Sequence, residues 1–293
     1  MHKFAIFGTG LIGTSLALAL KQAQPLAHII GFDADTASLN IAQSRGAIDV
    51  VGDVAAIALA DFIILAMPVR QMPQVLMQIV PHLQANTIVI DVGSTKQDVI
   101  AAARAALGEK IAQFVPCHPI AGREQHGPTA ADAALFAGKN VIITPLPENT
   151  ESTLQRVRAL WTSIDMQVIE MSAANHDAVF AAVSHLPHML AFALVDEMAS
   201  RSNAKTLFAH AASGFRDFTR IASSSPAMWR DVALNNREAL LAELDAFLAR
   251  AHTMRDALAE SDDATLFALM QRAQTARGHW LSGNFEHFND DLL

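Results

Sequence analysis

The sequence contains no tyrosine among its 293 residues, and this absence excludes one large class of dehydrogenase. Short-chain dehydrogenases need a catalytic tyrosine with a lysine four residues further on, so their mechanism is not available to this chain. Cysteine is nearly absent as well. The single residue, Cys117, excludes an internal disulfide and a thiolate-rich metal site. We interpret Cys117 as a small buried hydrophobic side chain.

Long apolar runs and positive charge are also scarce. The longest purely apolar runs, such as residues 62–67, are too short to span a bilayer. The first strand is predicted to begin at Lys3, which leaves no room for a signal or transit peptide, so we expect a cytoplasmic protein. With 21 basic and 29 acidic residues the net charge is −8, and we expect no nucleic acid or membrane partner.

The residues that are present predict a globular chain with two domains. Hydrophobic residues make up 52% of the sequence and charged residues 17%. The first 170 residues alternate β-like and helical runs, which predicts an α/β domain (1–170) with a mostly parallel sheet. After Ser172 the apolar spacing of three and four predicts an all-α domain (171–293). The predicted strands are 3–7, 28–32, 48–51, 62–67, 87–92, 112–116, 140–144 and 166–170, and the predicted helices between them are 11–22, 35–44, 70–80, 96–107 and 150–163.

A glycine-rich turn, GTGLIG, follows the first predicted strand. In a dinucleotide-binding turn Gly8 permits the tight bend, Gly10 lets the backbone approach the pyrophosphate, and Gly13 lets the helix pack close to the strand. Leu11 and Ile12 would open the helix whose N-terminus faces the phosphates. Asp33 ends the second strand about 20 residues further on, where a carboxylate binds the ribose 2′-hydroxyl and repels a 2′-phosphate. We therefore predict NAD as the cofactor, with a glycine turn of another α/β protein, such as a methyltransferase, as the alternative.

Three further segments follow predicted strands, at the sheet edge where α/β proteins bind ligands. They contain Pro68, Ser94 and His118. Oxidation of an alcohol needs a base for the hydroxyl proton, and histidine suits this role because its usual pKa is ~6.5. His118 is the best-placed histidine, although a histidine at a strand end can also serve only to cap a loop. Ser94 is interpreted either as a helix N-cap or as a partner of the reacting hydroxyl.

The helical half carries two polar motifs. His185 and His188 lie three apart and so share a helix face, either as polar surface or, with His176, as metal ligands, although no third ligand shares that face. Arg220 could bind a carboxylate in a bidentate manner, with Asp217 orienting it, or it could belong to a solvated charge cluster. Trp229 is interpreted as packing or as a pocket wall.

An apolar stripe in the helical half predicts either ordinary core or a subunit interface. It lies within residues 240–254 and comprises Leu240, Leu241, Leu244, Phe247, Leu248 and Ala251. A helical domain of this size with so much apolar surface often buries it against a copy of itself. We expect a homodimer formed through the helical domain.

Taken together, these motifs resemble the prephenate/arogenate dehydrogenase family, the cyclohexadienyl dehydrogenases of tyrosine biosynthesis. The resemblance runs along nearly the whole chain. It implies an α/β Rossmann-like domain followed by an all-α dimerisation domain, with the active site between them. The matching segments are GTGLIG at 8–13, DVGSTK at 91–96, HPIAGRE at 118–124, SHLPH at 184–188 and GFRDFTRIA at 214–222, followed by Trp229.

The resemblance also implies roles for individual residues. His118 resembles the catalytic histidine that accepts the ring hydroxyl proton, and Ser94 the serine that supports the same hydroxyl. Arg220 resembles the arginine that binds the ring carboxylate of the anionic substrate. The remaining matching positions surround the substrate, and they are Glu124, Asp217, His185, His188 and Trp229. Arg123 and Ser213 depart from some members, which carry a small polar residue and a glycine there.

Two rival functions share parts of this pattern. A β-hydroxyacid dehydrogenase has the same two-domain layout but places a catalytic lysine early in the helical half. The only lysine after Lys139 is Lys205, which lies outside any matching glycine-rich motif. A non-catalytic NAD-sensing protein would not need His118, Ser94 and Arg220 together. The sequence therefore favours oxidative decarboxylation of prephenate or arogenate, without distinguishing the two substrates.

Overall fold

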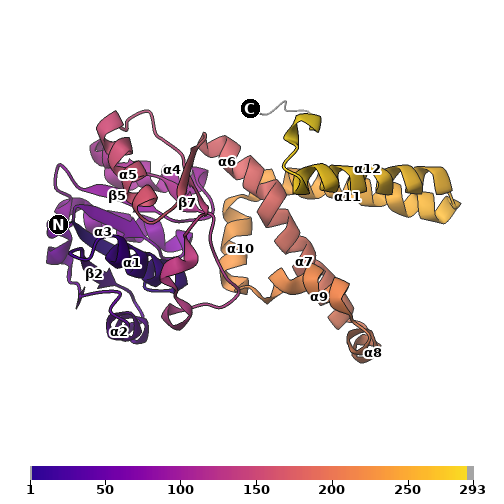
Figure 1. Cartoon of the computed structure of the whole chain (residues 1–293), viewed down its shortest axis with the longest axis horizontal. Coiled ribbons are helices and arrows are strands. Elements are labelled where there is room, and N and C mark those ends of the chain that lie inside the picture. The colour runs from indigo at the N-terminus through magenta and orange to yellow at the C-terminus, as the bar shows by residue number, and fades with distance from the viewer. Residues whose placement is uncertain (1, 289–293) are drawn as a thin grey trace. The chain divides into compact units, whose positions relative to one another are not determined.

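A computed structural model describes residues 2–288 of the chain. Its centre is a six-stranded, fully parallel sheet in the order β3-β2-β1-β4-β5-β6 (Figure 1). This order places the carboxyl ends of β1 and β4 side by side at the point where the strand order reverses, and ligands bind there in open α/β sheets. The strands of this sheet are β1 (Lys3–Phe7), β2 (His28–Phe32), β3 (Val50–Val51), β4 (Phe62–Leu65), β5 (Ile88–Asp91) and β6 (Phe114–Val115).

Helices cover both faces of this sheet, and the alternation of residues along each strand explains why. In β1, Phe4 and Ile6 point into one apolar cluster, while Ala5 and Phe7 point into the other. Such near-continuous apolar runs are typical of strands buried on both faces. The first cluster packs against α1 (Leu11–Ala23), α2 (Thr36–Ser44) and α5 (Glu151–Ser163), and the second against α3 (Met72–Ile79) and α4 (Gln97–Leu107).

The structure confirms the predicted fold class but separates three strands from the main sheet. A second sheet has the order β7-β8-β9, formed by β7 (Cys117–Pro119), β8 (Asn140–Ile143) and β9 (Gln167–Glu170). The pattern did not predict β7, which pairs antiparallel with β8. Pro116 lies between β6 and β7, and because proline has no N–H to donate it interrupts a ladder. The chain therefore leaves the parallel sheet just before His118.

Several shorter helices follow the second sheet. Two of them, α6 and α7, are joined by a π-helical turn at Ala181–His185 into one helical run, Ala173–Ala199. By length and composition alone this run could cross a membrane. Its polar residues His176, Asp177 and His185 are buried and hydrogen-bonded, so we interpret it as a helix of the folded domain. The helices are α6 (Ala173–Phe180), α7 (Leu186–Ala199), α8 (Ala204–Ala209), α9 (Ser213–Thr219) and α10 (Pro226–Asn235).

The contacts between residues divide the described chain into two compact units. The first unit ends at Arg237 and the second begins at Glu238, because α6 and α10 contact the nucleotide-binding part directly. The second unit contains nearly all of α11 (Arg237–Glu260) and all of α12 (Asp263–Leu281). Within it, Leu241, Phe247 and Leu248 of the predicted apolar stripe are exposed in the single chain, whereas Leu240 is buried. The stripe is therefore mostly surface, as a subunit interface requires.

Candidate active site

The glycine-rich turn has the geometry that its three glycines predict. Gly8 has a φ of +95°, and a Cβ there would lie 2.6 Å from the carbonyl carbon of Ala66. A Cβ on Gly13 would lie 1.9 Å from the carbonyl oxygen of Gly8. A Cβ on Gly10, by contrast, would meet nothing within 4 Å. Gly8 and Gly13 are thus required by packing, while the space beside Gly10 is open to a ligand.

The N-terminus of α1 is suited to bind phosphate. Gly10 is its N-cap residue, and no side chain caps the first turn. The amides of Leu11 and Ile12 lie in this turn, where helix N–H groups lack partners within the helix. Uncapped amides together with the helix dipole favour an anion at this position.

The carboxylate of Asp33 holds the glycine turn from the end of β2. One oxygen accepts hydrogen bonds from the backbone N–H of Thr9 at 2.6 Å and from its hydroxyl at 3.0 Å. The other oxygen accepts only the backbone N–H of Asp35, at 2.9 Å. Each carboxylate oxygen can accept about two hydrogen bonds, so one position remains for a further donor such as a ribose hydroxyl. Pro68 follows β4 in the loop whose first residues, Ala66 and Met67, contact Gly8.

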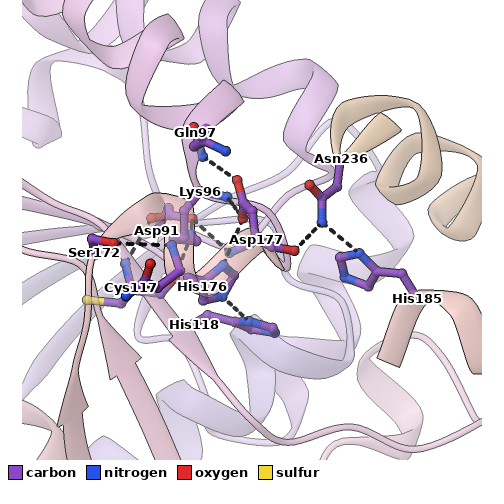
Figure 2. Close-up of polar contacts among 12 residues, drawn as sticks. Asp91, Lys96, Gln97, Cys117, His118, Ser172, His176, Asp177, His185 and Asn236 are labelled. Carbon is purple, nitrogen blue, oxygen red and sulfur yellow. Dashed lines mark hydrogen bonds and ion pairs between the residues drawn. The ribbon is translucent and has the colours of Figure 1, made fainter. Parts of the chain in front are cut away.

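A buried ion pair fixes the start of β7. The side chains of Lys96 and Asp91 are both fully buried and form a direct ion pair (Figure 2). The Lys96 Nζ also donates to the carbonyl oxygen of Cys117 at 2.7 Å, and Asp91 accepts the Cys117 N–H at 3.0 Å. Both backbone groups of Cys117 are therefore bound to this pair. The residue that follows, His118, is held in place by it. Cys117 is itself buried, as predicted, and burial raises the pKa of its thiol.

Ser94 is not the N-cap residue of α4, in contrast to one of its two interpretations from the sequence. Helix α4 begins at Gln97, and its N-cap residue is Lys96, whose side chain does not cap the helix. The carboxylate of Asp177, about 80 residues further along the chain, accepts the backbone N–H groups of Lys96 and Gln97, each at 2.9 Å. Ser94 is half-buried just before this turn and is not needed as the cap. Its hydroxyl is thus free for the other role that the sequence suggested.

His118 lies in a cluster of aromatic rings. Its Nδ1 lies 2.8 Å from Nε2 of His176, and Nδ1 of His176 lies 2.8 Å from the Asp177 carboxylate (Figure 2). The ring of Phe180 packs against both imidazoles, with centroid distances of 4.9 and 4.6 Å. Burial, and then the neighbouring His176, Lys96 and His185, lower the pKa of His118 well below its ordinary value. At neutral pH His118 is therefore an unprotonated base.

The two histidines of SHLPH do not form a polar helix surface. His185 is buried, and its Nδ1 lies 3.1 Å from the side-chain nitrogen of Asn236, which also donates to the carbonyl oxygen of Asp177. Burial lowers the pKa of His185 to about 4. His188 stacks on Trp229 with a centroid distance of 3.5 Å. Trp229 is buried, so it belongs to the packing around these histidines.

Arg220 is paired with Glu124 rather than with Asp217. The guanidinium of Arg220 donates to the carboxylate of Glu124, which lies in the loop after β7. The Arg220 side chain is 62% exposed, so this contact leaves much of the guanidinium open to solvent. Asp217 is exposed on α9, and Arg123 pairs with Asp132. The contact between Arg220 and Glu124 brings the arginine of the helical region to the loop that follows β7 and His118.

Within residues 2–288 there is no group of three or more histidine, cysteine or acidic side chains that could hold a metal ion. His176 lies beside Asp177 and His118, but these groups bind one another through hydrogen bonds.

Comparison with known proteins decides the family. Residues 16–170 match the prephenate dehydrogenase nucleotide-binding domain, and residues 172–272 match the prephenate dehydrogenase dimerization domain. The chain belongs to the prephenate/arogenate/cyclohexadienyl dehydrogenase family. It is therefore an oxidoreductase, and its helical region contains a dimerisation domain.

Individual relatives agree with this assignment. The chain is 36% identical to the prephenate dehydrogenase of Bacillus subtilis over 92% of this chain and 74% of that protein. It is 35% identical to the cyclohexadienyl dehydrogenase of Zymomonas mobilis over 93% and 94% of the two chains. A crystal structure of prephenate dehydrogenase from A. aeolicus, in complex with hydroxyphenyl propionate and NAD+, has a TM-score of 0.88 at 32% identity. It covers 95% of this chain and 98% of that one.

The sequence interpretation missed several residues that build the site. It includes Lys96 and Asp91 only as the ends of the DVGSTK segment, and His176 only as an alternative metal ligand. It does not include Asp177 or Asn236. One signal was present in the sequence: Thr95-Lys96-Gln97 begins a helix without offering a good N-cap side chain at Lys96. A helix start of this kind needs an acceptor from elsewhere in the fold, and Asp177 provides it.

Proposed function

We propose that this protein oxidises and decarboxylates prephenate, arogenate or both with NAD, using His118 as the base. The observation that carries the proposal is the hydrogen bond of His118 Nδ1 to His176, which leaves its other ring nitrogen, Nε2, for a substrate. Family membership and the uncapped N-terminus of α1 support the same reaction. We also propose that the protein acts as a cytoplasmic homodimer formed through its helical domain.

The residues of the glycine turn fit a dinucleotide. The open space at Gly10 and the amides of Leu11 and Ile12 would receive the pyrophosphate. Asp33 would use its remaining acceptor position for a ribose hydroxyl, and its charge would repel a 2′-phosphate. When bound, NAD supplies the acceptor for the hydride that leaves the hydroxyl carbon. The A. aeolicus relative binds NAD+ in its crystal structure, which supports this choice of cofactor.

The substrate roles follow from the chemistry of the side chains. His118 would accept the ring hydroxyl proton at Nε2 while Ser94 supports the same oxygen. Arg220 would bind the ring carboxylate, because a guanidinium that is mostly exposed and held only by Glu124 can bind a second anion. As the hydroxyl carbon is oxidised, CO₂ leaves from the opposite carbon and the ring becomes aromatic. The protein's task is to position the ring and remove one proton, and a placed base contributes about 10²–10⁴-fold in rate.

A direct assay tests the proposal. Purified protein is mixed with NAD and either prephenate or arogenate, and the absorbance of reduced nicotinamide is followed. His118→Asn is expected to reduce turnover about 10²–10⁴-fold and to leave the affinity for NAD nearly unchanged. The matched control is His82→Asn, a histidine in the turn before β5 that lies outside the site. Retained turnover in His118→Asn would refute the role of His118. No turnover of either substrate by the unmodified protein would refute the proposed function.

A further inference from the structure

A chain of hydrogen bonds connects His118 to a buried carboxylate. His118 on β7 contacts His176 on α6 at 2.8 Å, and His176 contacts Asp177 at 2.8 Å (Figure 2). His176 and Asp177 are buried side chains. Adjacent residues of one helix therefore supply both the middle and the end of the chain, and the base is presented to them from the second sheet.

The donors around Asp177 determine the direction of these hydrogen bonds. Its carboxylate already accepts two backbone N–H groups, from Lys96 and Gln97, and an ionised carboxylate has no hydrogen to donate. Burial alone raises the pKa of Asp177, but the hydrogen bonds from His176, Gln97 and Lys96 bring it below its ordinary value. The proton between Asp177 and His176 must therefore sit on Nδ1 of His176. Burial lowers the pKa of His176, which stays neutral, so its Nε2 is an acceptor.

The same logic extends to His118. Because Nε2 of His176 accepts, Nδ1 of His118 must carry the hydrogen in their contact. A neutral imidazole carries one hydrogen, so Nε2 of His118 is left with its lone pair. That tautomer is the one that can accept a proton from a substrate hydroxyl. With the opposite tautomer, Nε2 would carry a hydrogen and could not act as a base.

We propose that His176 and Asp177 are positioning residues, which fix His118 as the tautomer with a free Nε2 and stabilise the imidazolium that forms when it takes the substrate proton. This inference rests on the proposed role of His118 as the base. The proton moves from the substrate oxygen to Nε2, and the hydrogen on Nδ1 stays in its bond to His176. The negative charge of Asp177 then acts on the new positive charge through one intervening ring.

The charged groups around the chain show which of them can act on His118. The titratable groups facing the chain are Asp91, Lys96, Asp98, His176, Asp177 and His185. Lys96 is paired with Asp91, and burial keeps His185 neutral. Burial raises the pKa of Asp98, which interacts with Asp177. Asp177 is the carboxylate that is hydrogen-bonded to His176, and through it Asp177 can offset a charge on His118. Phe180 fills the space behind both imidazole rings and restricts their rotation.

Substitutions at Asp177 and His176 test the inference through kinetics. Asp177→Asn removes the negative charge, while its amide oxygen can still accept from Lys96 and from Nδ1 of His176, so the variant isolates the effect of the charge. We expect kcat to fall by up to about 10²–10⁴-fold, the contribution of a placed base, while KM and NAD affinity change less than about threefold. The acidic limb of the kcat profile should move to lower pH, because the imidazolium loses its stabilising charge. Asp165→Asn is the control, since Asp165 is exposed and its backbone has a positive φ that asparagine accepts.

A pair of substitutions at His176 separates positioning from folding, because both leave the bonds from Asp177 to α4 in place. The amide of glutamine can place an acceptor where His176 has Nε2 and a donor toward Asp177, so His176→Gln should keep kcat within about tenfold of the unmodified protein. His176→Leu offers no acceptor and should lose about 10²-fold or more. Equal kcat for these two variants, or an unchanged kcat in Asp177→Asn, would overturn the inference. If His118→Asn itself retains turnover, the proposed role of His118 fails together with the inference, while the proposed reaction stands.

The tautomer can also be measured directly. In protein with ¹⁵N-labelled histidine, His118→Asn assigns the imidazole signals of His118 by their loss. We expect the hydrogen on Nδ1 of His118 in the unmodified protein at neutral pH. A hydrogen on Nε2 in the unmodified protein would overturn the inference, whatever the kinetics.

Discussion

Removal of the buried lysine should cost more stability than any surface change in this protein. Lys96 and Asp91 are fully buried, and their ion pair also binds both backbone groups of Cys117. Lys96→Met keeps the length and apolar stem of the side chain but removes the ammonium group. The Asp91 carboxylate would then remain buried, with only the N–H groups of Gly93 and Cys117 as donors.

The expected loss of stability in Lys96→Met follows from the Asp91 carboxylate that remains buried and unpaired. Breaking a buried ion pair by removing one partner costs about 3–5 kcal/mol, because the remaining charge is uncompensated. The lost hydrogen bond to the Cys117 carbonyl adds about 1–3 kcal/mol for a buried acceptor left unsatisfied. The double variant Asp91→Asn/Lys96→Met removes both charges and keeps an amide oxygen to accept from Cys117. It should recover at least about 1 kcal/mol relative to the sum of the two single changes.

The assay is a double-mutant cycle in urea at neutral pH, with fluorescence and circular dichroism as independent probes. Coincident transitions by the two probes are needed before the midpoints are converted to free energies. Lys205→Met is the control, because it makes the same change at an exposed lysine on α8. A loss below about 1 kcal/mol in Lys96→Met, equal to that of the control, would show that the pair does not hold the start of β7.

Four shorter predictions address the glycine turn, the cofactor, the substrate and pH. Gly13→Ala should lose about 1–3 kcal/mol of stability and weaken NAD binding, because its Cβ would lie 1.9 Å from a backbone oxygen. Gly10→Ala should keep its stability and lose only NAD affinity, as measured by titration. Activity with NAD should exceed that with NADP, and Asp33→Asn should narrow the ratio; equal activity of the unmodified protein with both would contradict the role of Asp33. Arg220→Ala should raise KM for the substrate roughly tenfold to a hundredfold through loss of a charge-assisted hydrogen bond, with NAD affinity as the internal control. The free energy of unfolding should fall by about 3 kcal/mol between pH 6.5 and pH 4, because His185, with its pKa near 4, stays neutral in the fold while the same histidine in the unfolded chain takes up a proton. His185→Gln should reduce this loss, and a flat stability profile in the unmodified protein would contradict the prediction.

Local pattern was sufficient to predict most of the nucleotide-binding fold from the sequence. The strands β1, β2 and β4 are short apolar runs between clear helices, and their predicted starts agree with the structure. The strand predicted at 112–116 shrinks to β6, Phe114–Val115, because the preceding residues form a 3₁₀ helix. β7 was missed because three residues interrupted by histidine and proline show no alternation. Its pairing with β8 depends on a contact across more than 20 residues, which a local pattern does not contain.

The candidate site was partly predictable for a similar reason. Gly8 and Asp33 directly follow β1 and β2, at the sheet edge where ligands bind in α/β proteins. His118 was expected at the same edge, but it lies within β7 of the second sheet, just after β6 ends. The contact between Arg220 and Glu124 was not predicted, since the two residues come from different halves of the chain. The burial of His185 was also missed, because it depends on the π-helical turn and on Asn236, 51 residues away. Positions at strand ends can therefore be predicted from the sequence, and contacts between distant segments cannot.

The position of Asp177 joins the stability of this fold to its chemistry. A carboxylate that caps α4 from a distant helix must be buried and ionised, since it accepts two backbone N–H groups there. A buried ionised carboxylate is also what a neutral histidine pair needs in order to adopt one tautomer. The carboxylate that caps α4 therefore also provides the negative charge beside the histidine pair, without a separate charged residue. Asparagine at position 177 keeps part of the cap but has no charge. We therefore expect Asp177→Asn to retain its folding better than its turnover.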